Sequence, residues 1–308
     1  MKRIIFTFVL LSSLSWAAPL SNTARTCIPM DVQQIIVVDY RSMLNFPTAL
    51  ALKDKVMPEP LKEFERALKS VGIDPEHDVE QLVFATYRQR EGLKLMGVAQ
   101  GQFAGDKLTA RMVKQKIKGK KYRTFIIYPM GNGLSMVMVD SINMVFGFDE
   151  VVKTSLDVYD GYQGRSLNAN TKVTDMIGGV HADTIWSVLD PTGTQVMLKT
   201  ALGDAAEVAD FESVKKRVQG SRWGMTFNNG VLLDLRVASS DSMSAGALAT
   251  LIKVGVSIRK SAGSASEKAA LEGVTVSSDA KDLRLVFKAD DSKFKDLLST
   301  ELFAAVSK

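Results

Sequence analysis

The sequence predicts an α+β protein made of two similar lobes, each a mostly antiparallel sheet with helices packed on it. Short β-branched runs alternate with amphipathic helical segments, and turn signals join neighbouring strand-like runs. A unit of hairpin, acidic cap and amphipathic helix also recurs along the chain. With 308 residues, 46% of them hydrophobic, the length suggests about two domains of ~150 residues. The single cysteine excludes an internal disulfide, so stability must come from burial.

Residues 1–17 have the plan of a secretory signal peptide. A basic start precedes an apolar core over residues 4–11, and Ser15 and Ala17 are the small residues of a cleavage site. We therefore expect cleavage after Ala17 and export to the periplasm or the medium. The apolar core is shorter than the about 20 residues that span a bilayer, and no later stretch is long enough. The mature chain is thus expected to lack a transmembrane segment.

The predicted first lobe comprises residues 18–165. Residues 60–71 are expected to form a helix because their apolar side chains recur with helical spacing, and Gly72 ends it. Residues 89–92 are expected to form a hairpin turn between two strands. The other expected elements are six strands and two helices with acidic caps at Asp106 and Asp149, over residues 35–40, 82–88, 93–103, 122–128, 134–139, 143–147, 106–117 and 149–159.

The predicted second lobe, residues 166–308, repeats this order. Its acidic caps follow those of the first lobe by 135 and 142 residues, and its Pro-Thr pair follows by 144. Such offsets indicate a tandem duplication with its boundary in the Gly- and Asn-rich segment 160–170. Asn228 to Gly230 form a strong turn signal. The expected strands and helices, with caps at Asp210, Asp241 and Asp290 or Asp291, cover residues 184–189, 211–218, 223–227, 231–237, 242–255, 274–277, 283–287 and 291–302.

The segment 107–123 is the sharpest local feature, with eight Lys or Arg residues and no acid. If residues 106–118 are helical, four of these cations fall at i, i+4, i+7 and i+11 and form one positive stripe, with Lys116 and two following lysines in support. Such a stripe is expected to bind an anionic lipid, an acidic glycan or an acidic protein surface. The alternative is a solvated helix face followed by a lysine-rich turn. The predicted binding residues are Lys107, Arg111, Lys114, Lys118, Lys120 and Lys121.

The overall charge gives no general case for nucleic-acid binding. The net charge of +5 falls by two, to +3, once Lys2 and Arg3 leave with the signal peptide. No aromatic residues interleave with the cations of the basic segment, as they do in proteins that bind single-stranded nucleic acid. The expected partner is therefore another anionic molecule.

Metal and cofactor motifs are weak throughout the chain. Residues 74–80 carry acidic residues at alternate positions, as the start of a calcium-binding loop does. The motif is incomplete, because Val79 replaces the required Gly and Ala85 replaces the closing Glu. The two histidines, His77 and His181, lack metal-ligand spacing. A cluster of four methionines could bind soft copper, but methionines also fill ordinary hydrophobic cores, and we expect this second role. The cluster comprises Met130, Met136, Met138 and Met144. No cofactor is predicted.

Support for catalysis is equally thin. The chain has no G-x-S-x-G motif, and its three Ser-x-x-Lys matches, at Ser213, Ser257 and Ser292, lack the supporting motifs of their enzyme families. Cys27 is expected near a frayed N-terminus. The sequence therefore favours a non-enzymatic binding or interaction protein of the bacterial envelope or secreted fraction. A hydrolase whose carboxylates converge only in the fold, and a structural or assembly component of the envelope, are the alternatives.

Overall fold

The computed structural model describes residues 20–103, 105–180, 183–202, 211–300 and 303. The predicted signal peptide and its cleavage site therefore lie outside the described residues. The same holds for His181, Asp210, Leu302 and the side chains of Pro60, Asp106 and Lys107. Within the described part of the chain, no helix has the length and apolarity that crossing a membrane requires.

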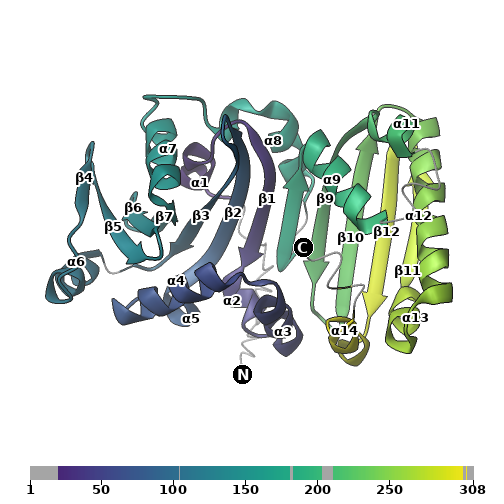
Figure 1. Cartoon of the computed structure of the whole chain (residues 1–308), viewed down its shortest axis with the longest axis horizontal. Helices are drawn as coiled ribbons and strands as arrows, with labels where there is room; N and C mark the ends of the chain where they lie inside the picture. The colour runs from purple at the N-terminus through teal and green to yellow at the C-terminus, as the bar shows by residue number, and fades with distance from the viewer. Residues whose placement is uncertain (1–19, 104, 181–182, 203–210, 301–302, 304–308) are drawn as a thin grey trace, which may run out of the picture.

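One sheet of twelve strands runs through the described part of the molecule (Figure 1). Its strand order is β11-β12-β10-β9-β8-β1-β2-β3-β7-β6-β5-β4, and all neighbouring strands are antiparallel. The pairing of β1 with β8 joins the two halves of the chain. The strands are β1 (Val32–Asp39), β2 (Val79–Gln89), β3 (Gly92–Gly101), β4 (Lys120–Tyr122), β5 (Phe125–Gly131), β6 (Leu134–Met138), β7 (Asn143–Phe148), β8 (Ile185–Leu189), β9 (Val218–Thr226), β10 (Val231–Ser239), β11 (Val274–Asp279) and β12 (Asp282–Ala289).

The predicted hairpins form at their turn signals. Gly92, with φ 115°, lies at the turn between β2 and β3. Asn229 and Gly230, with φ 57° and 102°, lie between β9 and β10. A left-handed backbone conformation at these positions lets a tight turn follow the twist of the two strands. Asn and Gly adopt this conformation at the lowest energetic cost. The turn chemistry thus sets which residues of β9 and β10 lie opposite each other.

Eight described helices precede β8 in the chain. α4 is strongly amphipathic, and its Phe64 and Leu68 are buried against the sheet, as their helical spacing predicts. Gly72, with φ 78°, follows its end. The helices are α1 (Asn22–Cys27), α2 (Tyr40–Met43), α3 (Pro47–Val56), α4 (Glu59–Ser70), α5 (Pro75–Asp78), α6 (Gly105–Lys114), α7 (Asp149–Tyr159) and α8 (Thr171–Gly178), with a 3-10 turn at Leu167–Ala169.

Five helices follow β8 within the described residues. α12 is the longest described helix, and the carboxylate of Asp241 accepts a hydrogen bond from the Ser244 N–H at its start, as the predicted cap requires. Asp290 caps the last helix in the same way, through the Lys293 N–H. The helices are α9 (Pro191–Leu202), α11 (Phe211–Lys215), α12 (Ser242–Ala262), α13 (Ala265–Leu271) and α14 (Asp291–Leu297).

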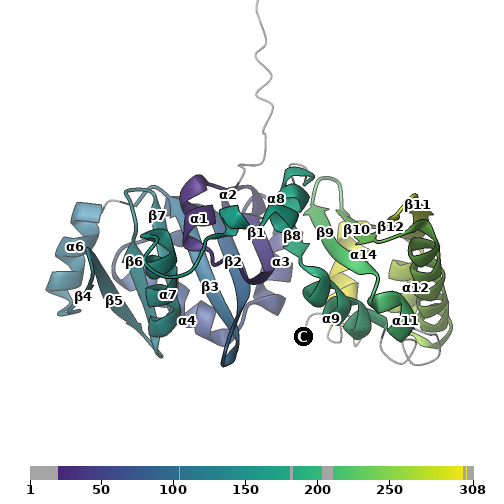
Figure 2. The same ribbon diagram turned by 90° about the horizontal axis from the view of Figure 1, so that it is seen from above.

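The two faces of the sheet are covered differently in the two halves (Figure 2). In the first half, α1 and α7 lie on one face and α2 to α5 on the other, so both faces are buried, and α8 continues the first of these layers over β8 and β9. In the second half, α9, α11, α12, α13 and α14 pack on the face that also carries α4. The opposite face of β10, β11 and β12 is open to solvent.

The two halves share a hydrophobic core. Phe46 of the first half stacks on Phe227 of the second, with ring centroids 6.2 Å apart. Thr48 donates a hydrogen bond of 2.5 Å to Asp291, the first residue of α14. One cluster of buried residues contains side chains from both halves. The predicted α+β class with its antiparallel sheet is confirmed, and the halves meet in one continuous sheet.

The strand orders of the halves correspond. Reading outward from the central pair, the first half runs β1-β2-β3-β7-β6 and the second β8-β9-β10-β12-β11. Each central strand ends at an aspartate whose carboxylate caps the next helix: Asp39 accepts from the Ser42 N–H and Asp190 from the Gly193 N–H. This correspondence fits the predicted duplication, which stays a prediction together with its boundary at residues 165 and 166.

Several local expectations need correction. Asp149 is the first residue of α7 and not its cap; the cap is Phe148, and Asp149 pairs with Lys153 one turn on. Cys27 is fully buried at the end of α1, because this helix packs against α7 and is not frayed. Helices α3, α8, α9 and α13 have no counterpart among the expected elements. Val218, expected in a helix, begins β9.

Candidate functional site

The predicted basic segment lies at the end of the sheet farthest from the second half, where Figure 1 shows α6 and β4. α6 ends at Lys114, not near residue 117. Lys116 adopts φ 58°, the Ile117 N–H bonds to the Met112 carbonyl, and the Lys116 N–H bonds to the Val113 carbonyl. These two bonds close a Schellman motif, which terminates the helix without a glycine. Lys118 therefore lies beyond the helix, and the predicted helical stripe of four cations does not form.

Arg111 is committed to the protein's own backbone. Its guanidinium donates a 2.7 Å hydrogen bond to the Gly72 carbonyl, just past the end of α4. Gln115 donates a hydrogen bond to the Ser70 carbonyl of the same helix end. A cation at a helix C-terminus satisfies free carbonyls and interacts favourably with the helix dipole. Arg111 is therefore a structural contact between α6 and α4, although its side chain is exposed.

Arg123, the last cation of the segment, is also engaged. It donates a 2.7 Å hydrogen bond to the carboxylate of Asp157 in α7, and its guanidinium lies 3.4 Å from the ring centroid of Tyr162. The Tyr122 hydroxyl donates to the same carboxylate at 2.9 Å. This ion pair and its aromatic neighbours fasten the β4–β5 turn to α7.

The remaining described lysines of the segment are free of such contacts. All five are exposed, and within the described part of the chain none forms an ion pair with an acidic side chain. Two of them belong to the edge strand β4 and extend to its opposite faces. Lysines on an edge strand discourage pairing with another chain, so part of their role is protective. The five are Lys114, Lys116, Lys118, Lys120 and Lys121; Lys107 belongs to α6, but its side chain lies outside the described residues.

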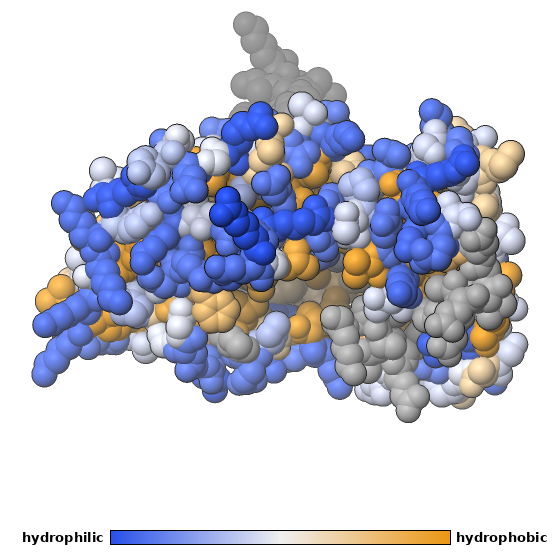
Figure 3. All heavy atoms as spheres, turned by 45° about the horizontal axis from the view of Figure 1, so that its top comes forward, coloured by the Kyte–Doolittle hydropathy of each residue, from blue (hydrophilic) through white to orange (hydrophobic). Residues whose placement is uncertain are grey.

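Apolar side chains are exposed beside these lysines. Val113 of α6 is 72% exposed and Ile126 of β5 is 49% exposed. Figure 3 shows hydrophobic surface next to strongly hydrophilic surface at this end of the molecule. A partner surface that is anionic and partly apolar can therefore contact the lysine charges and the exposed apolar side chains together.

A second group of cations, which no local sequence pattern indicated, lies on the open sheet face of the second half. Arg222 of β9, Arg236 of β10 and Arg284 of β12 lie directly opposite one another on neighbouring strands. Asp234, also on this face, accepts hydrogen bonds from the Nε and Nη2 atoms of Arg284, the shortest of 2.8 Å. The turn at residues 228–230 sets the register that places Arg222 opposite Arg236, but the expected strand began only at residue 223. The third arginine required the pairing of β10 with β12.

The motifs that resemble metal sites have ordinary structural roles. Asp74 caps the short helix α5 and accepts a 2.8 Å hydrogen bond from the His77 ring, which lowers the pKa of its carboxyl. Asp78 accepts a hydrogen bond from the Asp74 N–H. Met136 and Met144 are fully buried in the core. Among the described residues, no group of three His, Cys, Asp or Glu side chains is arranged to hold a metal ion.

One network of buried titratable groups bears on the hydrolase alternative. Lys53 of α3 lies 2.7 Å from the Glu65 carboxylate of α4 and donates a 2.8 Å hydrogen bond to the Tyr40 hydroxyl. Burial lowers the pKa of Lys53, but its bonds to Glu65 and Tyr40 outweigh burial and raise it. Burial also raises the pKa of the Tyr40 hydroxyl. Lys53 and Tyr40 thus hold their protons more firmly than usual, which suits a structural clamp better than proton transfer.

The cavity beside this network is small. It lies between α4 and the sheet, is lined by apolar side chains such as Leu61, Phe84 and Phe146, and has a volume of ≈ 30 Å³. A space of this size holds about a water molecule or two, far less than pockets for small-molecule ligands. The cavity as it stands therefore does not accommodate an amphiphile, and surface sites carry the functional argument.

Comparison with known proteins informs the fold alone. No protein-family model and no curated protein matches the sequence. Among solved structures, crystal form I of TP0453 is similar with a TM-score of 0.50 and 8% sequence identity, over 92% of this chain and 99% of that one. Crystal form III of TP0453 gives a TM-score of 0.51 and 9% identity, over 93% and 98% of the two chains. The architecture, with its large antiparallel sheet, is thus shared with a known structure across nearly the whole length.

Proposed function

We propose that this chain is an exported, non-enzymatic protein that binds an anionic partner through its basic segment, residues 107–123. The observation that carries the proposal is the set of five exposed lysines, with no acidic partner among the described side chains, at one end of the sheet. The exposed Val113 and Ile126 beside them add apolar contact area. The signal-peptide plan of residues 1–17 supports an exported site of action.

The expected strength of this interaction is modest and depends on salt. A basic side chain close to an anionic surface contributes about 1 kcal/mol, and salt screens the interaction within ~10 Å at 0.1 M. Four or five lysines together give useful attraction at low salt and little at high salt. Anionic lipid, acidic glycan and acidic protein surfaces share this chemistry.

The test replaces Lys114, Lys118, Lys120 and Lys121 by Glu and leaves Arg111 unchanged, because Arg111 holds α6 to α4. The matched control reverses four exposed lysines elsewhere, with the same change in net charge: Lys55, Lys172, Lys216 and Lys253. Co-sedimentation with phosphatidylglycerol vesicles, and binding to alginate as an acidic polysaccharide, are measured between 20 and 500 mM salt. Circular dichroism checks that both variants fold.

We expect the wild type and the control to bind at low salt, and the segment variant to lose at least tenfold in affinity. Binding by the wild type should also weaken steeply as salt rises. Equal loss in the control would mean that net charge alone is responsible. If the wild type binds neither probe at 20 mM salt, the lysines are a solvated surface and a protected sheet edge.

Export is tested separately. Mass spectrometry of the mature protein should find Ala18, or a residue within a few positions of it, at the N-terminus. An intact Met1 on protein recovered from the cytoplasm would contradict export.

A further inference from the structure

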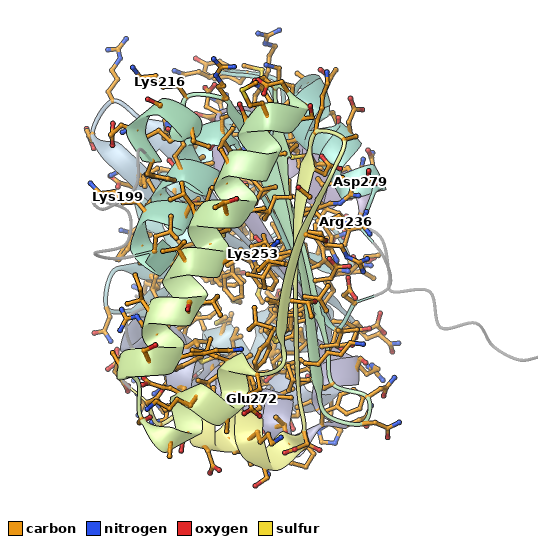
Figure 4. The ribbon with its side chains drawn as sticks, turned by 90° about the vertical axis from the view of Figure 1, so that its right-hand side faces the viewer. Lys199, Lys216, Arg236, Lys253, Glu272 and Asp279 are labelled. Atoms are coloured by element: carbon orange, nitrogen blue, oxygen red, sulfur yellow. The ribbon has the colours of Figure 1, made fainter. Side chains whose placement is uncertain are left out.

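The open sheet face of the second half carries a row of three arginines. Residues of one strand alternate between the two faces of a sheet, and the register places Arg222, Arg236 and Arg284 side by side across β9, β10 and β12. Figure 4 shows Arg236 on the side of the strands that is turned away from α12. No described helix lies over this part of β10 and β12, where Arg236 is half-buried and Arg284 is exposed.

The acidic residues on this face contact the row unevenly. Asp234 forms a two-bond contact with Arg284 and lies 3.8 Å from the Nε atom of Arg236. Asp183 reaches the same face farther along β9, beside Gly224. The two acids at the turn between β11 and β12 lie opposite each other and not opposite an arginine. Like charges directly opposite each other destabilise a sheet, and among the described ion pairs a single carboxylate, that of Asp234, contacts this row of three guanidinium groups.

Arg222 is the arginine of the row that lacks an ion-pair partner among the described residues. Its side chain is half-buried, and no described carboxylate forms an ion pair with it. Its guanidinium lies against Gly179, just after α8, where an added Cβ would come within 1.7 Å of the Nη1 atom. A guanidinium that gives up part of its hydration without a counter-charge is unfavourable unless something else compensates it. The missing counter-charge points to a ligand.

We infer that Arg222 and Arg236 together bind a phosphoryl oxyanion, while Arg284 is held in place by Asp234. Neighbouring strands lie about 4.8 Å apart, so two adjacent guanidinium groups can reach different oxygens of one tetrahedral anion. The planar fork of arginine matches phosphate oxygens in a way that lysine does not. The exposed Leu232 and half-buried Val286, on the same face, leave room for the apolar part of a phosphate ester.

This site is independent of the basic segment, which lies at the other end of the sheet. The two sources of a phosphoryl group are a soluble phosphate or phosphate monoester and the headgroup of a phospholipid. Both present the same oxyanion to the arginines, so the experiment includes a probe for each. The soluble phosphate probes test the arginine row whether or not the basic segment binds an anionic partner.

The test measures inorganic phosphate, glycerol 3-phosphate and phosphatidylglycerol vesicles against the full mature chain by titration calorimetry. Arg222→Gln/Arg236→Gln removes the two binding groups, and Lys216→Gln/Lys253→Gln is the control with the same charge change in the same half. Gly179→Ala displaces Arg222 without changing any charge. Asp234→Asn removes the competing carboxylate. Urea unfolding confirms that each variant is folded.

We expect saturable binding of at least one probe by the wild type and the lysine control, and at least a tenfold loss in the arginine pair. Gly179→Ala should weaken binding, and Asp234→Asn should strengthen it severalfold. Binding of the soluble esters identifies a free phosphate site. Binding of vesicles alone identifies a headgroup site when the arginine pair loses it, because the basic segment is also proposed to bind these vesicles. Absence of binding to every probe at 10 mM phosphate, or equal binding by the arginine pair and the wild type, would overturn the inference.

Discussion

Single side chains in this protein are tied to the ends of secondary-structure elements. Asp241 is an example: its carboxylate accepts the Ser244 N–H at the start of α12, and also bonds to Ser240 and Arg217. The hydrogen bond from the Ser244 backbone is the largest cause of the lowered pKa of this carboxyl. Because the charged form is favoured in the folded state, its contribution to stability is complete above the unfolded pKa of about 4. This contribution is lost as the pH falls below that value.

We predict that Asp241→Ala lowers the melting temperature by a few degrees at pH 7, and that Asp241→Asn lowers it less, because Asn still caps the helix. The difference between wild type and Asp241→Ala should shrink as the pH is lowered from 5 towards 2. Thermal unfolding followed by circular dichroism over this range provides the measurement. A difference that stays constant with pH would show that the charge of Asp241 does not contribute.

At the scale of elements, three helices meet in the contact of Tyr40, Lys53 and Glu65. α2, α3 and α4 each contribute one of these side chains, and the shortest contact joins Lys53 to Glu65 at 2.7 Å. The two side chains are only 16% and 25% exposed. An ion pair of this kind is destabilising chiefly when one partner is removed, because the other charge then stays buried alone.

Glu65→Leu is therefore predicted to lower the free energy of unfolding by about 2 kcal/mol, a value discounted for the partial exposure of the pair. The double variant Lys53→Met/Glu65→Leu should lie within about 1 kcal/mol of the wild type, because it leaves no unpaired charge. Urea unfolding of both variants and of Lys53→Met measures the difference. A double variant less stable than Glu65→Leu would mean that the pair is strongly stabilising in itself.

Local signals were sufficient to predict the hairpins and the amphipathic helices, and insufficient where tertiary contacts decide. The turn at Asn229 and Gly230 and the apolar stripe of α4 both act within a few residues. The end of α6 was missed because Lys116, and not a glycine, adopts the left-handed conformation. α9 was missed because its apolar residues form only a weak stripe, and its buried Gly193 and Thr194 are ordinary in a loop.

The candidate sites show the same division. The lysines of the basic segment are exposed as the sequence predicts, because a run of cations without acids has no local partner. Their expected arrangement on one helix is wrong at Lys118, because α6 ends at Lys114. The arginine row depends on strands more than 40 residues apart in the chain and on a face that no described helix covers. Neither the pairing of β10 with β12 nor the openness of this face follows from local spacing.

For the whole molecule, the shared core of the two halves has a measurable consequence. Residues of both halves contribute to one buried cluster, in which Phe46 stacks on Phe227. We predict that the mature chain unfolds in one cooperative step. The fluorescence of Trp223 reports on the second half, whereas that of Trp186 reports on the seam, because Trp186 packs in the core cluster that also contains Cys27. The thiol of Cys27, whose pKa burial raises to about 12, reports on the first half because it reacts only once exposed.

The urea midpoints of tryptophan fluorescence and of Cys27 alkylation should coincide. Phe227→Ala should lower both by the same amount, since a buried aromatic side chain contributes about 3–5 kcal/mol. Two separate midpoints would instead show two lobes that unfold independently, as the predicted boundary at residues 165 and 166 implies.

The seam between β1 and β8 also bears on the order in which the chain can fold. Ile35 lies opposite Val188, so β1 appears early in synthesis and meets this partner only after some 150 further residues have followed. In a chain that emerges N-terminus first, β1 has a free edge of main-chain donors and acceptors during this interval. Such an edge is a template for association with other chains. The midline of the sheet thus closes long after β1 has been made, and it is most vulnerable before β8 arrives.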